Sequence, residues 1–137
     1  MIKILVLCTG NSCRSQIAEG YLKLFLKGKA QVFSAGTKNH KINKYAIETM
    51  KGDGIDISTH SSNHVSEFKK IKFDYVITVC DHAKETCPIF ISNSSTKIHK
   101  NFFDPSSITK SEKIKEAFEL CRDEIKKFCY DFSKNLN

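Results

Sequence analysis

Tryptophan is absent from the 137-residue sequence, and only two prolines and two arginines occur in it. No apolar run approaches the roughly 20 residues that a membrane-spanning helix needs. The apolar stretch at the start, Met1 to Leu7, is too short for a signal peptide, and no small-residue cleavage site follows it. We therefore expect a cytoplasmic protein that does not enter a membrane.

Repeats and linkers are missing as well. The sequence has no internal repeat, no low-complexity segment and no Pro/Gly-rich boundary. A chain of this length can bury one core without disulfide or metal staples. We therefore expect a single domain over residues 1–137, and we expect it to act as a monomer.

Positive charge is abundant but not clustered. The net charge is +7, the lysines are spread along the chain mostly as singles and pairs, and the two arginines, Arg14 and Arg122, lie far apart in the sequence. Proteins that bind nucleic-acid phosphates usually concentrate Lys and Arg on one element. We therefore expect a solvated, lysine-rich surface and no nucleic-acid partner, although a basic chain still favours anionic ligands such as oxyanions.

Short apolar runs alternate with segments of helical spacing. Strands are predicted at Ile2–Leu7, Gln31–Ala35, Phe73–Val79 and, briefly, Lys97–His99. Helices are predicted around residues 17–25, closed by Gly28; around residues 46–50, stopped by Gly52 and Gly54; and from a cap region at Ser111 to Phe132. This alternation predicts an α/β fold with a four-stranded parallel sheet and helices on both faces, in which ligands lie beyond the carboxyl ends of the strands.

The segment Cys8 to Ser15 (Cys-Thr-Gly-Asn-Ser-Cys-Arg-Ser) leads from the first strand into the first helix. Its small residues can turn backbone N–H groups inward around an anion, and Gly10 and Asn11 tolerate the positive φ that such a loop needs. Arg14 can return over the hollow and hold two anion oxygens. Cys8 lies at the base, where N–H groups and the helix dipole would lower its pKa and make it a nucleophile. Ser15 can donate a hydrogen bond to that thiolate.

Two further places follow the later strands. A regular helix between Cys80 and Cys87 would hold their Cα atoms about 10 Å apart, beyond the roughly 7 Å that a disulfide tolerates. A disulfide between them therefore needs the segment to unwind, which suits a redox switch. Asp104 precedes Pro105 in an extended loop and can protonate an oxygen that leaves a bound oxyanion. Two buried cysteines and a plain Asp-Pro turn are the alternatives.

The other candidates have simpler explanations. Cys121 and Cys129 lie on or beside the apolar stripe of the last helix and are expected to be buried and unreactive. His60 could line the site from a loop. A zinc site is a weaker alternative, with the ligand set Cys8, Cys13, Cys80 and Cys87.

These segments together resemble a known family. Cys8 to Ser15 matches the Cys-x5-Arg-Ser loop of the low-molecular-weight tyrosine phosphatase superfamily, and with Cys80 and Cys87 the chain resembles the thioredoxin-coupled arsenate reductases on that fold. The resemblance covers nearly the whole chain in order, through Ala18-Glu19-Gly20, Ser34-Ala35-Gly36, Asp56-Ile57-Ser58, His60, Val79-Cys80, Cys87-Pro88 and Asp104-Pro105.

The resemblance implies a reaction with three cysteines. Cys8 attacks arsenate, for which phosphate or sulfate can act as mimics, and Asp104 protonates the departing oxygen. Cys80 then attacks Cys8 and releases arsenite, Cys87 attacks Cys80, and thioredoxin reduces the exposed Cys80–Cys87 disulfide. The oxyanion is held by Thr9, Gly10, Asn11, Ser12, Cys13 and Arg14. No metal or organic cofactor takes part in this chemistry.

The sequence departs from the family at two places. Some members bind a structural potassium ion, and the matching residues here are Asn11, Glu19, Ser34, Ser61 and Asn63. Asn63 replaces an expected Asp, so a site for this hard cation is weaker here or absent. The phosphatases usually have aromatic residues after Asp-Pro that hold a phenol ring. Here Ser106 and Ser107 follow Pro105, which argues against phosphotyrosine as the main substrate.

Two other functions stay open at this stage. A low-molecular-weight protein tyrosine phosphatase would hydrolyse phosphate monoesters through a Cys8 phosphoenzyme, with Arg14 and Asp104, and would not need Cys80 or Cys87. A non-enzymatic oxyanion sensor would signal through the redox state of Cys80 and Cys87. The sequence favours arsenate reduction, and weak phosphatase activity is compatible with it because the first step is shared.

Overall fold

The computed structural model describes residues 1–88, 91 and 95–136. Its one sheet has the strand order β2-β1-β3-β4, with β1 (Ile2–Cys8), β2 (Ala30–Gly36), β3 (Tyr75–Thr78) and β4 (Thr96–His99). The helices are α1 (Arg14–Phe25), α2 (Lys44–Gly52), α3 (Asp81–Thr86) and α5 (Ser111–Asn135), and the 3-10 turns are η1 (Val65–Phe68) and η2 (Pro105–Ser107). All strand pairs are parallel, which confirms the predicted α/β fold.

Strand β1 is central and pairs with both β2 and β3. Its last five residues, Ile4 to Cys8, are buried, as expected for a parallel strand covered on both faces. The register sets Cys8 beside Gly36, and Leu7 beside Thr78. The carboxyl ends of the strands therefore meet at one edge of the sheet, and the loops that follow β1 and β3 lie there together.

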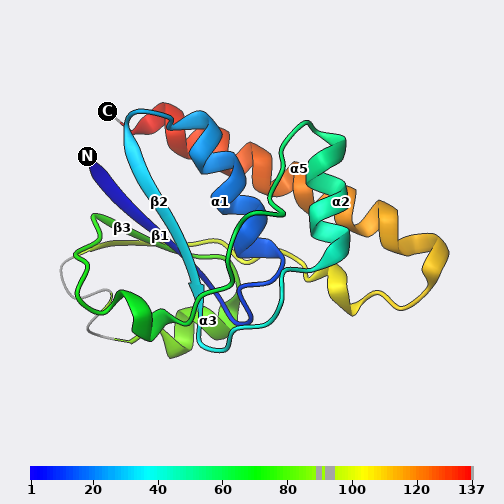
Figure 1. The fold of residues 1–137 in the computed structure, drawn as a ribbon, viewed down its shortest axis with the longest axis horizontal. Coiled ribbons are helices and arrows are strands. Elements are labelled where there is room, and N and C mark those ends of the chain that lie inside the picture. The colour runs from blue at the N-terminus through cyan, green and yellow to red at the C-terminus, as the bar shows by residue number, and fades with distance from the viewer. Residues whose placement is uncertain (89–90, 92–94, 137) are drawn as a thin grey trace.

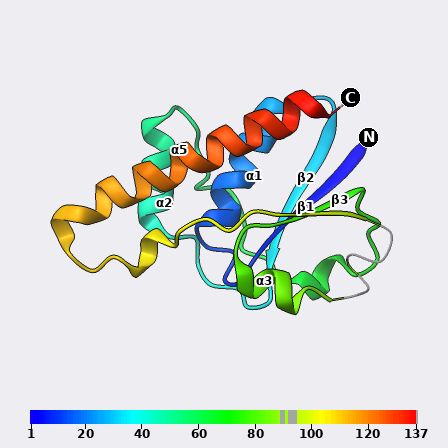
Figure 2. The same cartoon turned by 180° about the vertical axis from the view of Figure 1, so that it is seen from behind.

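The helices are divided between the two sides of the sheet. Figures 1 and 2 show α1, α2 and α5 gathered on one side and α3 on the other. Helix α5 turns Phe118, Cys121, Ile125 and Cys129 into the core. Its apolar spacing predicted the first three of these, whereas Ile114, Phe128 and Phe132 of the same stripe are only partly buried. In the part of the chain that the structure describes, no helix is both long and apolar enough to cross a bilayer.

The ends of several elements differ from the sequence prediction. Strand β3 is shorter than Phe73–Val79 because the register with β1 holds only over Tyr75–Thr78. Ser111 is the first residue of α5 rather than its cap; the N-cap is Lys110, which makes no side-chain capping bond. Gly52 is the last residue of α2, and the positive φ of 79° is found at Gly54 in the turn beyond it.

Candidate active site

The loop between β1 and α1, residues 8–14, is called here the oxyanion loop. Asn11 is its turning point: its φ is 50°, and its side chain is fully buried. The Asn11 amide donates to the hydroxyls of Ser15 (2.8 Å) and Ser34 (2.9 Å), and its Oδ1 accepts from the backbone N–H of Asn63 (2.7 Å). The positive φ expected at Asn11 is confirmed, while Gly10 has no positive φ. The Asn11 side chain thus supports the loop from inside the protein.

Gly36, at the end of β2, lies directly against the oxyanion loop. A Cβ atom at this position would lie 2.9 Å from the Asn11 nitrogen and against the Thr9 carbonyl. These are backbone atoms, so the clash could be relieved only by a shift of the loop. The absence of a side chain at Gly36 therefore lets β2 support the oxyanion loop at close range.

Arg14 begins α1 and turns back beside the oxyanion loop. Its Nη1 donates to the Phe102 carbonyl at 2.9 Å, and its Nη2 lies 3.7 Å from an Asp104 carboxylate oxygen. The other Asp104 oxygen accepts hydrogen bonds from the N–H (3.0 Å) and the hydroxyl (2.6 Å) of Ser106. The fold thus brings together an anion-holding guanidinium and the predicted carboxyl acid, which are far apart in the sequence.

Cys8 and Cys80 form the chemical centre of this arrangement. Their sulfur atoms lie 3.5 Å apart, with the Cys8 thiol donating to Cys80, and the two residues are only 5% and 4% exposed. This bond, the Thr9 hydroxyl and the Ala83 backbone N–H lower the pKa of Cys80 to about 5. The bond to Cys80 and burial raise the pKa of Cys8.

The prediction that Cys8 is the acidic thiol is therefore wrong for this resting state. Two thiols in contact hold one proton between them, because a second negative charge beside the first is strongly disfavoured. The contact raises the pKa of Cys8 and lowers the pKa of Cys80, which favours the proton on Cys8. The sequence showed the loop around Cys8 but could not show that β3 brings Cys80 into contact with it.

Ser15 is buried under the oxyanion loop, where it accepts a hydrogen bond from Asn11. The expected bond from Ser15 to the Cys8 sulfur is not among the bonds of the described residues. Ser15 therefore acts here on the shape of the loop, while the partner of the Cys8 thiol is Cys80.

Helix α3 connects Cys80 to Cys87, which are its N-cap and C-cap residues. Cys80 is buried and Cys87 is half-buried, and no disulfide joins any of the six cysteines. A separate contact fixes the start of the helix, where the Asp81 carboxylate lies 2.7 Å from His99 Nε2 on β4. The helix that the sequence allowed between the two cysteines is therefore formed, and it holds the two residues at its opposite ends.

His60 approaches the oxyanion loop only through Gln16. His60 Nδ1 lies 3.0 Å from Gln16 Oε1, and Gln16 Nε2 donates to the Asn11 carbonyl at 3.0 Å. Burial lowers the pKa of His60 against the opposing effect of Glu19. The sequence indicated His60 but not Gln16. A polar side chain on an otherwise buried helical face is the signal that could have identified Gln16.

The remaining cysteines, Cys13, Cys121 and Cys129, are buried. Cys121 and Cys129 are buried, and burial raises the pKa of Cys121 to about 12 and also raises that of Cys129. Cys13 is buried as the N-cap of α1, and burial raises its pKa as well. Within the described residues, no group of three or more His, Cys, Asp or Glu side chains is arranged to hold a metal ion, so the alternative zinc site is not assembled.

The residues matched to a potassium site form a closed hydrogen-bond network of their own. The set is Asn11, Glu19, Ser34, Ser61 and Asn63. Its one carboxylate, Glu19, pairs with the Lys23 ammonium and accepts a bond from Ser34. Asn63 turns its Nδ2 donor toward the carbonyls of Ser34 and Ser61. With its charge already paired and amide donors facing its oxygens, this network does not fit a resident potassium ion.

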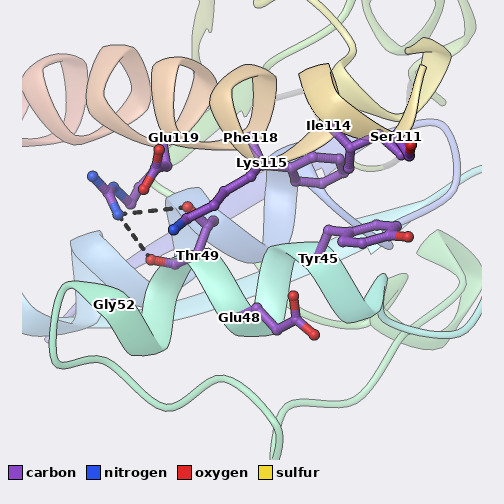
Figure 3. Close-up of a pocket in the computed structure, with 10 residues that line it drawn as sticks. Tyr45, Glu48, Thr49, Gly52, Ser111, Ile114, Lys115, Phe118 and Glu119 are labelled. Atoms are coloured by element: carbon purple, nitrogen blue, oxygen red, sulfur yellow. Dashed lines mark hydrogen bonds between the residues drawn. The ribbon is translucent and has the colours of Figure 1, made fainter. Parts of the chain in front are cut away.

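A cavity of about 410 Å³ lies elsewhere, between α2 and α5 (Figure 3). Tyr45 and Phe118 border it on opposite helices. Arg122 also lines it and donates to the Thr49 carbonyl at 3.0 Å. Its charged lining residues, Glu48, Glu119, Lys115 and Arg122, are of both signs. No residue of the oxyanion loop lines this cavity, so it is separate from the thiol pair.

Known proteins with the same arrangement identify the family. A family model described as low molecular weight phosphotyrosine protein phosphatase matches residues 3–137. Arsenate reductase 1 of Staphylococcus epidermidis is 46% identical over 123 residues, which cover 90% of this chain and 89% of that protein. The arsenate reductase of Halalkalibacterium halodurans is 42% identical over 132 residues, covering 96% and 94%. A solved arsenate reductase in the phosphate binding state superimposes with a TM-score of 0.86 at 28% identity, with 100% of both chains covered. The chain belongs to the low-molecular-weight phosphotyrosine protein phosphatase family and, within it, to the arsenate reductases.

Proposed function

We propose that this protein reduces arsenate to arsenite by a relay through Cys8, Cys80 and Cys87. The observation that carries the proposal is the 3.5 Å contact between the sulfur atoms of Cys8 and Cys80. Phosphate-ester hydrolysis needs only one thiol, whereas two thiols in contact can deliver two electrons and form a disulfide. The relatives named as arsenate reductases support the same conclusion.

In the first step, the oxyanion loop holds arsenate. Backbone N–H groups of residues 9–14 at the start of α1 and the Arg14 guanidinium surround its oxygens. The Cys8 sulfur forms a bond to arsenic as an arsenic–oxygen bond breaks, and the oxygen leaves as water with a proton from Asp104. The proton of Cys8 passes to the neighbouring Cys80 as the bond forms.

In the second step, Cys80 loses that proton and attacks the Cys8 sulfur. A sulfur–sulfur bond forms, the bond from Cys8 to arsenic breaks, and its electron pair stays on arsenic. Arsenic is reduced from the +5 to the +3 state, and the two thiols are oxidised to a disulfide. The contact between Cys8 and Cys80 supports this step because the reacting sulfurs are already neighbours.

In the third step, Cys87 attacks Cys80 and Cys8 leaves as a thiol. Helix α3 cannot stay intact in this step, because a regular helix holds the Cα atoms of its cap residues Cys80 and Cys87 about 10 Å apart, whereas a disulfide needs them within about 7 Å. Unwinding of Asp81–Thr86 would carry the new disulfide away from the buried loop toward a reductant. We propose thioredoxin as that reductant, with the protein acting as a cytoplasmic monomer of one domain and without a cofactor.

Phosphatase activity is the second candidate, and the Arg14–Asp104 pair favours it as a side reaction. The same loop can hold phosphate, and Asp104 can protonate the leaving oxygen of an ester. Ser106, which follows the Asp-Pro pair, is hydrogen-bonded to Asp104 and offers no ring to hold a phenol. We therefore propose that ester hydrolysis is slow compared with arsenate reduction.

Arsenite formation tests the proposal. The reduced protein is incubated with arsenate, thioredoxin, thioredoxin reductase and NADPH, and p-nitrophenyl phosphate hydrolysis is measured separately. We expect repeated arsenite production that requires thioredoxin, together with weak ester hydrolysis. Efficient hydrolysis without arsenite would make the protein a phosphatase, and arsenate binding without any turnover would make it a sensor.

A further inference from the structure

A chain of polar atoms leads from the buried thiol pair to the protein surface. It begins with the Cys8–Cys80 contact of 3.5 Å. Thr9 Oγ1 then lies 3.3 Å from Cys80 Sγ and 3.1 Å from Nδ1 of His82, an exposed residue in the first turn of α3. One hydroxyl group thus touches both the resolving thiol and a titratable side chain that faces water.

The single hydroxyl proton of Thr9 links the states of its two neighbours. If Thr9 donates that proton to a Cys80 thiolate, the Thr9 oxygen can accept a proton only from His82, which must then carry hydrogen on Nδ1. If His82 Nδ1 carries no hydrogen, Thr9 can donate to it instead, and the Thr9 oxygen can then accept from a Cys80 thiol. Loss of the proton at Cys80 and the presence of a proton on Nδ1 of His82 are therefore favoured together.

We propose that His82 accepts the proton of Cys80 through the Thr9 hydroxyl. The Cys80 S–H bond breaks and its proton goes to Thr9 Oγ1, while the Thr9 hydroxyl proton moves to His82 Nδ1 and forms an N–H bond. The products are a Cys80 thiolate and an imidazolium, no electrons change hands, and exposed His82 then releases the proton to water. His82 acts through Thr9 and does not touch the substrate, so its role is that of a positioning and proton-accepting residue.

This inference rests on the proposed function, in which Cys80 must lose a proton before it attacks Cys8. Cys8 and Cys80 are both buried, so the proton needs a route to water. Through Thr9, this chain of atoms connects Cys80 to an exposed side chain.

Several other charged groups lie around this chain of atoms. Cys8 and Arg14 belong to the oxyanion loop, and Lys38 and His40 follow β2 in a segment whose backbone N–H groups bond to the carbonyls of Thr9 and Gly10. On α3 itself, Asp81 is turned to His99 on β4, Lys84 lines a hollow with Cys87 and His99, and Glu85 is exposed. Among the described residues other than Cys80, His82 is the titratable one that contacts the Thr9 hydroxyl.

A second contact holds α3 in place independently of Thr9. The Asp81–His99 contact of 2.7 Å fixes the start of the same helix to β4 without touching Thr9. His99→Gln therefore provides a matched control, because it loosens the helix and removes an imidazole but leaves the Cys80–Thr9–His82 chain intact.

Two titrations on the reduced protein, without any oxyanion, test the inference. The first is the pH dependence of Cys80 alkylation by iodoacetamide, followed residue by residue in the unaltered protein and in His82→Gln, His82→Ala and His99→Gln. The second is the NMR titration of the His82 ring in the unaltered protein and in Cys80→Ser, with the signal assigned by its loss in His82→Gln. Thermal unfolding checks that each variant folds.

We expect both His82 variants to alkylate about fivefold more slowly at Cys80 near pH 6, with the profile moved to higher pH, and His99→Gln to match the unaltered protein. Because coupling between two sites is reciprocal, the His82 titration should move to lower pH by the same amount in Cys80→Ser. Arsenate turnover is measured alongside and should slow in both His82 variants.

Three results would overturn the inference. The first is a Cys80 alkylation profile that does not change in the His82 variants, together with a His82 titration that does not change in Cys80→Ser. The second is an equal shift of the Cys80 alkylation profile in His99→Gln, and the third is an unaltered profile in His82→Gln with a shift in His82→Ala alone. The third result would mean that His82 only forms a hydrogen bond with Thr9 and does not accept a proton. If the two titrations are coupled but no arsenate turns over, the proposed function fails and the coupling stands.

Discussion

At the scale of single residues, Cys8 and Cys80 divide one proton between two sulfur atoms. The pKa of Cys80 is lowered by the bond from the Cys8 thiol, and the Thr9 hydroxyl lies 3.3 Å from the same sulfur atom. Cys8 keeps its proton until an oxyanion enters the loop and gives it something to attack. Proton transfer between the two thiols therefore becomes part of the first chemical step, and reactivity depends on both residues together.

Arg14 is expected to act as a planar fork rather than as a point charge. Arg14→Lys keeps the charge but loses one of the two parallel hydrogen bonds to the oxyanion, so we expect kcat/KM for arsenate to fall about 100-fold, as for loss of one oxyanion donor. Steady-state kinetics check this value.

The other arginine of the chain is the matched control. Arg122 bonds the Thr49 carbonyl, away from the oxyanion loop. Arg122→Lys should change kcat/KM by no more than about twofold, because surface substitutions away from a site have small effects. Equal losses in the two variants, or full activity in Arg14→Lys, would show that Arg14 does not clamp the oxyanion.

Several site residues could be named from the sequence because they lie in one short segment. Cys8, Asn11 and Arg14 follow a strand and open a helix, and such a loop has a recognisable pattern. The contacts of Thr9 with Cys80 and His82 could not be foreseen, since they depend on where β3 and α3 lie beside β1. The predicted direction of the pKa shift at Cys8 was wrong for the same reason, because it depends on the contact with Cys80.

At the scale of elements, α3 has to unwind in the proposed reaction, because the intact helix keeps Cys80 and Cys87 too far apart for a disulfide. The helix has only six residues, and it is held at its start by the Asp81–His99 contact and the Thr9–His82 contact. A short helix has little stability of its own, because few backbone hydrogen bonds offset the cost of nucleation. Its tertiary contacts can therefore be given up when the Cys80–Cys87 disulfide forms.

Hydrogen exchange can detect this unwinding. In the protein oxidised at Cys80 and Cys87, we expect the amides of Asp81–Thr86 to exchange at least about tenfold faster than in the reduced protein. The amides of α2 (Lys44–Gly52) serve as an internal control and should not change. Equal protection of α3 in both redox states would mean that the disulfide forms without unwinding or does not form.

The elements themselves follow from local sequence more reliably than their ends do. The apolar stripe of α5 is four turns or more in length, so its existence was predictable. Its first residue was not, because Lys110 begins the helix without a side-chain cap. Strand β4 was only weakly indicated, since pairing with β3 rather than apolar content defines it.

At the scale of the whole molecule, the parallel sheet gathers the chemistry at one edge. Cys8, Gly36 and His99 each end a strand there, and Cys80 follows β3 at the same edge. The order β2-β1-β3-β4 puts the first strand in the centre, so the oxyanion loop has neighbours on both sides. The alternating sequence pattern could predict this class of fold and the edge at which the site lies, but not the individual distances.

Also at the scale of the whole molecule, potassium can be used to test whether the hydrogen-bond network of Asn11, Glu19, Ser34, Ser61 and Asn63 binds the ion. Because Glu19 is already paired with Lys23 and Asn63 brings no charge, replacing NaCl by KCl at equal ionic strength should move the thermal midpoint by less than about 1 °C. Differential scanning calorimetry measures it, and Asn63→Asp, which adds a carboxylate, is the comparison. A potassium-dependent rise of several degrees in the unaltered protein would show that the network opens to hold the ion.

The three-cysteine relay is tested most directly by Cys87→Ser treated with arsenate in the presence of thioredoxin. Without Cys87, no thiol of the relay can attack the Cys8–Cys80 disulfide, so this disulfide stays buried. The released arsenite is quantified and the disulfides are mapped by mass spectrometry. We expect one arsenite released per protein and a Cys8–Cys80 disulfide. The control Cys121→Ser, which alters a buried thiol outside the relay, should turn over repeatedly. Repeated arsenite production by Cys87→Ser would contradict the relay.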